Sequence, residues 1–270
     1  MKNDNGLCLE SSFLRKSVFG ITKAITQPRA SLSWVLRGHL AKDQSIVSQT
    51  YWFTGALPRV PLARVLPGIE LVDVSLPRAF DRKGGTSISV EEACNVAAMI
   101  KHMHARKALE IGTYDGNTAL LLASNLPADG AVVTVDLPPD FDRQQQGTLA
   151  YSDVELNLTD RSDLGRQYRG HPLAARIQQR YGDSATLDWN SLGGPFDVVF
   201  IDGCHSEEYV ASDSRNAMEQ LGPGGVIVWH DYGMIPGVSK VVDRIAEETP
   251  NMRMVALEGT RLAVALPKDC

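Results

Sequence analysis

A glycine turn near the middle of the chain constrains the fold more than any other feature. It joins a short apolar strand to a helix that we expect over residues 119–126, and it reads Ala108-Leu109-Glu110-Ile111-Gly112-Thr113-Tyr114-Asp115-Gly116-Asn117-Thr118. Its spacing is Glu-x-Gly-x-x-x-Gly, whereas the turn that holds a pyrophosphate in dinucleotide-binding folds reads Gly-x-Gly-x-x-Gly. The pattern predicts a strand-turn-helix corner that binds a different ligand. A corner with a purely structural role is the alternative.

The turn suits a nucleoside that carries a cationic amino-acid tail, as S-adenosylmethionine does. Glycines let the backbone approach a ligand closely, and Glu110 offers negative charge to an ammonium group. Asp136 follows Gly116 by twenty residues, where a carboxylate can accept both ribose hydroxyls. Asp183, with Ser184, suits the adenine amino group, although each acid alone is equally typical of a helix cap or turn. The residues assigned to the cofactor are Glu110, Gly112, Thr113, Tyr114, Asp115, Gly116, Asn117, Thr118, Asp136, Gly182, Asp183, Ser184 and Asp202.

Apolar segments alternate with helical ones after about residue 87. Strands are expected at 107–112, 131–136, 176–181, 196–202, 224–230, 252–257 and 261–266, and helices are expected to begin after Ser89, after Ser206 and at Pro236. The apolar runs lack strict alternation, as expected of strands that helices cover on both faces. A short turn, Glu258-Gly259-Thr260, joins the last two strands, so one of them must run antiparallel. The pattern predicts a Rossmann-like, doubly wound, seven-stranded and mostly parallel α/β sheet, which binds ligands beyond the carboxyl ends of its strands.

Four polar residues at the ends of two strands are the candidates for the reaction: Asp202, His205, His230 and Asp231. Methyl transfer from a sulfonium needs alignment and a deprotonated acceptor, and a histidine near its usual pKa can take the proton. We assign His205 and Asp202 as catalytic residues, with His205 as the base. Asp202, His230 and Asp231 are assigned to a divalent cation, Mg²⁺ or another, that acidifies an acceptor hydroxyl. A histidine that orients a carboxylate is the alternative for His230, and a helix N-terminal residue is the alternative for His205.

The composition of the chain limits the kinds of binding partner and of cell compartment that we expect. The chain has 270 residues, a net charge of −5 and four scattered cysteines without a Cys-x-x-Cys pair. The negative charge argues against nucleic acid, and the cysteines favour reduced thiols in a cytoplasmic protein. No apolar run approaches membrane-spanning length, and the first residues lack the order of a secretory signal.

The first part of the chain differs from the rest in its pattern of charged and apolar residues. We therefore expect a helical extension and linker over residues 1–86 and a main domain over 87–270. Every charged side chain between residues 11 and 42 is basic. Two amphipathic helices broken at Pro28 would explain this pattern. Such a basic face suits weak contact with a membrane surface, while a helical cap or a dimer contact is the alternative. We also expect a homo-oligomer.

Five motifs carry a resemblance to a known family: residues 109–116, 135–136, 180–184, 199–206 and 224–232. With them the chain resembles, from about Gly84 to its end, the class I S-adenosylmethionine-dependent methyltransferases. Within that class it is similar to the O-methyltransferases of the macrocin and cephalosporin-biosynthesis type, methyltransferase family 24. The resemblance implies a magnesium site at Asp202 and positions 230–231, and a general base at His205. The chain departs from the family by having His230 where metal-dependent relatives carry a carboxylate.

Taken together, the residues and the resemblance predict an S-adenosylmethionine-dependent O-methyltransferase that acts on a small polar acceptor, a sugar or a hydroxylated natural product. Two alternatives stay open. One is a non-enzymatic cofactor-binding module that the basic first forty residues dock to a membrane surface or a complex. The other is a nicotinamide-dependent oxidoreductase, for which the usual glycine pattern is missing.

Overall fold

The computed structural model describes residues 55–78, 88–141 and 164–268. These residues belong to a compact unit that begins at Thr54. The amphipathic helices expected between residues 11 and 42 lie outside the described residues. Among the described residues, no helix is long and apolar enough to cross a membrane.

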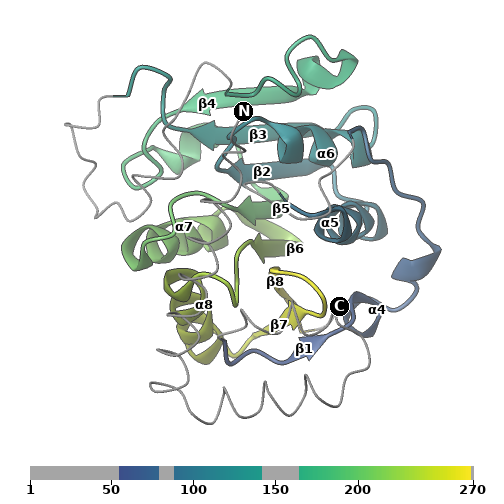
Figure 1. Ribbon diagram of the computed structural model, residues 1–270, viewed down its shortest axis with the longest axis vertical. Helices are drawn as coiled ribbons and strands as arrows, with labels where there is room; N and C mark the ends of the chain where they lie inside the picture. The colour runs from purple at the N-terminus through teal and green to yellow at the C-terminus, as the bar shows by residue number, and fades with distance from the viewer. Residues whose placement is uncertain (1–54, 79–87, 142–163, 269–270) are drawn as a thin grey trace, which may run out of the picture. The chain divides into compact units, whose positions relative to one another are not determined.

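A single sheet of eight strands organises the described part of the chain (Figure 1). The strands are β1 (Arg59–Val60), β2 (Lys107–Ile111), β3 (Ala131–Asp136), β4 (Ile177–Tyr181), β5 (Phe196–Ile201), β6 (Leu221–Trp229), β7 (Met252–Leu257) and β8 (Ala263–Pro267). Their order across the sheet is β1-β7-β8-β6-β5-β2-β3-β4. Only β8 runs antiparallel to its neighbours, β6 and β7, among these eight. The predicted Rossmann-like, mostly parallel sheet with one antiparallel strand is therefore confirmed.

The predicted number of seven strands is wrong by one, because β1 was placed in a linker. This strand has two residues, Arg59 and Val60, which pair in parallel with Ala256 and Leu257 of β7. A strand this short shows no periodicity, and the nearby Pro58 and Pro61 favour irregular structure. Its pairing partner lies almost two hundred residues later, so only the folded chain reveals it.

Helices cover both faces of the sheet, as the uninterrupted apolar strands require. Helices α5 (Val90–His102) and α6 (Asn117–Asn125) pack on one face, and α7 (Glu207–Glu219) and α8 (Pro236–Glu248) pack on the other (Figure 1). Each face has its own apolar core, with Leu120 and Phe200 buried in one and Val199 and Trp229 in the other. The shorter helices are α4 (Leu62–Val65), η1 (Ile69–Leu71), η3 (Pro172–Arg176) and η4 (Trp189–Leu192).

The helix starts expected from the sequence are present. Ser89 caps α5 by accepting a hydrogen bond from the backbone N–H of Glu92, and the Glu92 carboxylate accepts from the backbone N–H of Ser89. Ser206 caps α7 and Pro236 begins α8. These caps satisfy backbone donors that a helix leaves unpaired at its first turn.

The strand register brings the carboxyl ends of five parallel strands to one edge of the sheet. Ile111 pairs with Val135 of β3 and Ile201 of β5, and Ile201 pairs with Trp229 of β6. Asp136 pairs with Tyr181 of β4. The residues that follow these positions therefore line the same rim, where an open α/β sheet binds its ligand.

Candidate active site

The glycine turn lies at this rim, and its two glycines are required by close packing within the protein. Gly112 has φ +99°, and a Cβ there would lie 2.1 Å from the backbone oxygen of Asp202. Gly116 has φ +83°, and a Cβ there would lie 2.5 Å from the ring of Tyr168. Glycine is favoured at positive φ, and neither position has room for a side chain. The turn is thus fixed against the strand end that carries Asp202 and against residues 164–168.

The residues around the turn are held by hydrogen bonds from several elements. Thr113 Oγ1 accepts from the Gln179 amide at 3.0 Å and lies 2.6 Å from Thr134 Oγ1. The Asp115 carboxylate accepts from the backbone N–H of Asn117 and from the Gln167 amide. Asn117 and Thr118 are buried at the start of α6, whereas the Tyr114 side chain is exposed. The segment after residue 164 therefore packs directly on the turn.

Glu110 is fully buried at the centre of this rim. Its Oε2 accepts from the Thr134 hydroxyl, and its Oε1 has no hydrogen-bond partner among the described residues. Burial, with the nearby Asp202, Asp136 and Asp115 carboxylates, raises the pKa of Glu110 well above its usual value. Four acidic side chains close enough to affect one another create a negative field. Such a field favours a cationic ligand.

The two acids assigned to the ribose and the adenine are each held by hydrogen bonds, and they differ in the kind of partner. Asp136 accepts from the backbone N–H of Tyr114 and of Leu137, at the end of β3. Asp183 accepts from the backbone N–H of Ala185 and from the Tyr209 hydroxyl, at 2.9 Å. Asp136 is the last residue of β3 and Asp183 lies in the turn that follows β4, which are the positions expected from the sequence. Gly182 and Ser184 flank Asp183 in the same turn.

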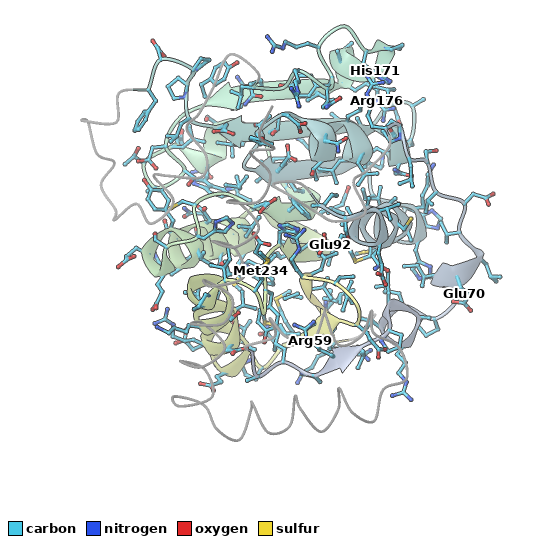
Figure 2. The ribbon with its side chains drawn as sticks, viewed as in Figure 1. Arg59, Glu70, Glu92, His171, Arg176 and Met234 are labelled. Atoms are coloured by element: carbon cyan, nitrogen blue, oxygen red, sulfur yellow. The ribbon has the colours of Figure 1, made fainter. Side chains whose placement is uncertain are left out.

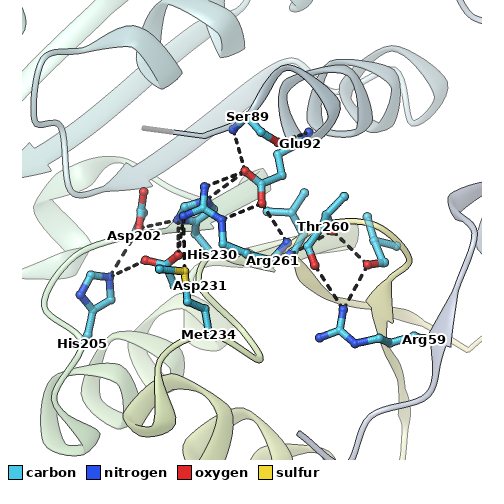
Figure 3. Close-up of polar contacts among 12 residues, drawn as sticks. Arg59, Ser89, Glu92, Asp202, His205, His230, Asp231, Met234, Thr260 and Arg261 are labelled. Atoms are coloured by element: carbon cyan, nitrogen blue, oxygen red, sulfur yellow. Dashed lines mark hydrogen bonds and ion pairs between the residues drawn. The ribbon is translucent and has the colours of Figure 1, made fainter. Parts of the chain in front are cut away.

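His230 lies between carboxylates and is almost completely buried (Figure 3). Its Nδ1 is 3.0 Å from Asp202 Oδ1 and 3.5 Å from Asp231 Oδ1, while its Nε2 is 3.4 Å from Glu92 Oε2. Burial opposes the charged ring, but the Asp202 and Asp231 carboxylates raise the pKa of His230 well above its usual value. Both ring nitrogens of His230 thus face carboxylate oxygens.

His205 faces the same two acids from the start of α7. Its Nε2 lies 3.3 Å from Asp231 Oδ2 and 3.7 Å from Asp202 Oδ1, and the side chain is 13 % exposed. The carboxylates stabilise the positive charge that His205 gains when it takes a proton. The structure thus brings together all four residues that the sequence singled out for the reaction.

Two further residues join this cluster that the sequence analysis did not assign to it. Arg261, in the turn between β7 and β8, binds the buried Glu92 through Nε and NH2 at 3.0 and 2.9 Å. Its NH1 binds Asp231 Oδ1 at 2.9 Å. Glu92 was interpreted only as a helix-capping residue, a role that it also has. Figure 2 shows Glu92 and Met234 in the middle of the molecule, away from His171 and Arg176 beside β4.

The donors present fit a divalent cation in part. One ligand atom from each of Asp202, His205 and Asp231 lies within 4.8 Å of the other two. A carboxylate and imidazole set admits manganese, iron or zinc as readily as magnesium. His230, which the sequence analysis assigned to the metal, is outside this group, and both of its nitrogens face carboxylates. The residues that could hold a metal are therefore Asp202, His205 and Asp231.

Comparison with known proteins identifies a methyltransferase domain in this part of the chain. Residues 109–232 match the family model of a methyltransferase domain, methyltransferase family 24. Catechol O-methyltransferase domain-containing protein 1 of Mus musculus is 27 % identical over 145 residues, which are 54 % of this chain and 49 % of the relative. Catechol O-methyltransferase B of Danio rerio is 22 % identical over 166 residues, 61 % of this chain and 56 % of the relative. The chain thus spans about half the length of these curated relatives.

The fold is also found among solved structures. A methyltransferase of Podospora anserina bound to S-adenosylhomocysteine superimposes with a TM-score of 0.53 at 14 % identity, over 80 % of this chain and 91 % of that one. At this identity the likeness establishes the fold alone. The chain thus has the fold of the class I S-adenosylmethionine-dependent methyltransferases, and its residues 109–232 match a methyltransferase domain of family 24.

Proposed function

We propose that the chain transfers the methyl group of S-adenosylmethionine to a hydroxyl of a small polar acceptor, such as a sugar or a hydroxylated natural product. The observation that carries the proposal is the double contact of Asp202. Its backbone oxygen packs against Gly112 of the glycine turn, and its carboxylate faces His205 and His230. The residue therefore links the cofactor turn to the polar cluster, which supports a base close to the bound methyl donor.

The cofactor assignment is supported by the charges at the rim. The sulfonium and the ammonium of S-adenosylmethionine are both positive, and Glu110, Asp115, Asp136 and Asp202 provide the negative field. An ammonium near the unpartnered Oε1 of Glu110 would favour the ionised carboxylate. We assign the ribose to Asp136 and the adenine amino group to Asp183, at the ends of β3 and β4.

The reaction is a direct displacement. The hydroxyl oxygen of the acceptor attacks the methyl carbon, the carbon–sulfur bond breaks, and S-adenosylhomocysteine leaves as a neutral thioether. His205 takes the hydroxyl proton, and Asp231 and Asp202 stabilise the imidazolium that forms. An oxygen acceptor is favoured because nitrogen nucleophiles carry their own lone pair and need less help from a base.

A metal-assisted form of the same reaction is the second candidate, favoured by the grouping of Asp202, His205 and Asp231. A divalent cation bound there would make an acceptor hydroxyl more acidic. His205 cannot serve at once as its ligand and as the base through the same nitrogen. The two forms therefore differ in their metal requirement.

The test is a transfer assay with tritium-labelled S-adenosylmethionine and a panel of sugars, catechols and hydroxylated natural products, run with and without EDTA. Label recovered as a methyl ether supports the proposal. Activity that EDTA abolishes and Mn²⁺ or Mg²⁺ restores favours the metal-assisted form, whereas full activity in EDTA favours His205 as the base. Binding of S-adenosylmethionine without transfer to any acceptor would overturn the O-methyl assignment. The cytoplasmic location, the homo-oligomer and the membrane contact stay predictions.

A further inference from the structure

Asp231 is the residue of the cluster whose orientation depends most on its surroundings. It has φ +55°, a left-handed conformation that is unfavourable for a residue with a side chain. Its Oδ2 faces His205 at 3.3 Å, and its Oδ1 faces Arg261. A carboxylate held at both oxygens keeps one orientation. Asp231 Oδ1 lies 2.9 Å from Arg261 NH1 and 3.5 Å from His230 Nδ1, so the shorter contact, with Arg261, restrains it most.

Arg261, the partner of Asp231 Oδ1, is held by several hydrogen bonds (Figure 3). Glu92 accepts from three nitrogens of Arg261: the backbone N–H at 2.8 Å, Nε at 3.0 Å and NH2 at 2.9 Å. The backbone oxygen of Arg261 accepts from the N–H of Tyr232, next to Asp231. Glu92 is itself fixed by the backbone N–H of Ser89, at 2.7 Å. A planar guanidinium bound in this bidentate way has its remaining nitrogen, NH1, aimed in one direction.

We propose that Glu92 and Arg261 are positioning residues for methyl transfer, which hold Asp231 so that its Oδ2 faces the His205 ring. Both lie outside the matched family domain at 109–232, one in α5 and the other between β7 and β8. They act through Asp231 and touch neither the cofactor turn nor His205 in the contacts described here. The proposal rests on the proposed function for its kinetic consequence only, because the orientation of His205 can be observed without turnover.

The chain offers matched controls for both residues. Arg59 binds the same β7–β8 turn through the backbone oxygens of Leu257 and Thr260. Arg59→Gln therefore removes hydrogen bonds to the turn and leaves the contacts of the Arg261 guanidinium with Glu92 and Asp231 in place. Glu91 precedes Glu92 in the first turn of α5, so Glu91→Gln removes the same charge from the helix start.

The experiment compares Arg261→Gln, Arg261→Lys and Glu92→Gln with Arg59→Gln and Glu91→Gln. Ring signals of ¹³C-labelled histidine report the surroundings of His205 at fixed pH, assigned among the six histidines with His205→Gln. We expect the His205 signal to move in the three test variants and to stay in the two controls. Arg261→Lys does not restore it, because a lysine cannot bind Glu92 and Asp231 with a rigid fork. Thermal melts identify any variant that fails to fold.

Kinetics provide the second readout. We expect kcat to fall about 10- to 100-fold in the test variants, with the KM for S-adenosylmethionine unchanged. The losses in the double variant Glu92→Gln/Arg261→Gln should be less than additive, because Glu92 holds the arginine that contacts Asp231, although Glu92 also contacts His230. A His205 signal that stays in place in Arg261→Gln, or moves equally in Arg59→Gln, overturns the proposal. If the wild-type chain methylates no acceptor, the proposed function fails, and the histidine spectra still decide the positioning role.

Discussion

Nδ1 of His230 lies 3.0 Å from Oδ1 of Asp202, so this histidine is an ionic partner of the carboxylate. The sequence analysis assigned both residues to one metal, with a histidine that orients a carboxylate as the alternative. The contacts with Asp202 and Glu92 support the alternative. A residue type that binds metals as a neutral ring serves here as a buried cation.

The charge of His230 makes the stability of the protein depend on pH. Its pKa in the folded state is raised above the usual value of 6.5, although burial opposes this, because Asp202 and Asp231 face the ring. The stabilisation is therefore fully present below pH 6.5 and is lost as the pH rises through the folded-state pKa. We expect the difference in free energy of unfolding between wild type and His230→Gln to shrink from pH 6.5 to pH 9, measured by urea denaturation. His102→Gln, outside the cluster, is the control, and a constant difference for His230→Gln would contradict the assignment.

Replacing the proposed base separates chemistry from binding. His205→Ala should lower kcat by about a hundredfold or more, because the acceptor loses the group that takes its proton. Binding of S-adenosylmethionine, measured by calorimetry, should be retained, because no described contact joins His205 to the glycine turn. Near-normal turnover would exclude His205 as the base. If metal binding rather than turnover alone is lost, His205 acts as a ligand instead.

Much of the fold could be predicted from local sequence, because its strands are long apolar runs. The rim acids were found for the same reason: each follows a strand whose end the sequence marks, as with Asp136 after Val135. Parallel pairing then brings those ends to one edge without any further information. The single short strand that was missed, β1, has only two residues and no such signal.

The interior of the site could not be predicted in the same way. Glu92 and Arg261 are 169 residues apart, and they meet only because α5 and the β7–β8 turn pack against the same rim. Glu92 also had a complete local explanation as a capping residue. His230 contacts Glu92 and Asp202, which come from other parts of the chain, and no local pattern reveals these contacts.

A buried acid away from the reaction should limit stability at high pH. Asp213 in α7 is fully buried, and burial raises the pKa of its carboxyl to about 7. Its stabilising contribution is present below the usual pKa of 3.8 and is lost as the pH rises through about 7. Asp213→Asn cannot ionise, so at pH 9 it should be more stable than wild type by several kcal/mol, with a clearly smaller gain at pH 5. Urea denaturation at both values, with the exposed Glu208→Gln as control, checks this; equal gains at both pH values would refute it.

The glycine turn allows backbone strain and side-chain collision to be measured separately. Gly116 and Gly224 have similar positive φ angles, +83° and +77°, but only Gly116 has a neighbour, the Tyr168 ring, where a Cβ would lie. Gly224→Ala should cost about 1–2 kcal/mol of stability from its backbone alone. Gly116→Ala should cost a further ~1–3 kcal/mol, because Tyr168 packs there and must move. The same variant should weaken S-adenosylmethionine binding, since Asp115 and Tyr114 belong to the displaced turn, whereas Gly224→Ala should not. Urea denaturation and calorimetry measure the two effects, and equal losses in both variants would show that Tyr168 yields without cost.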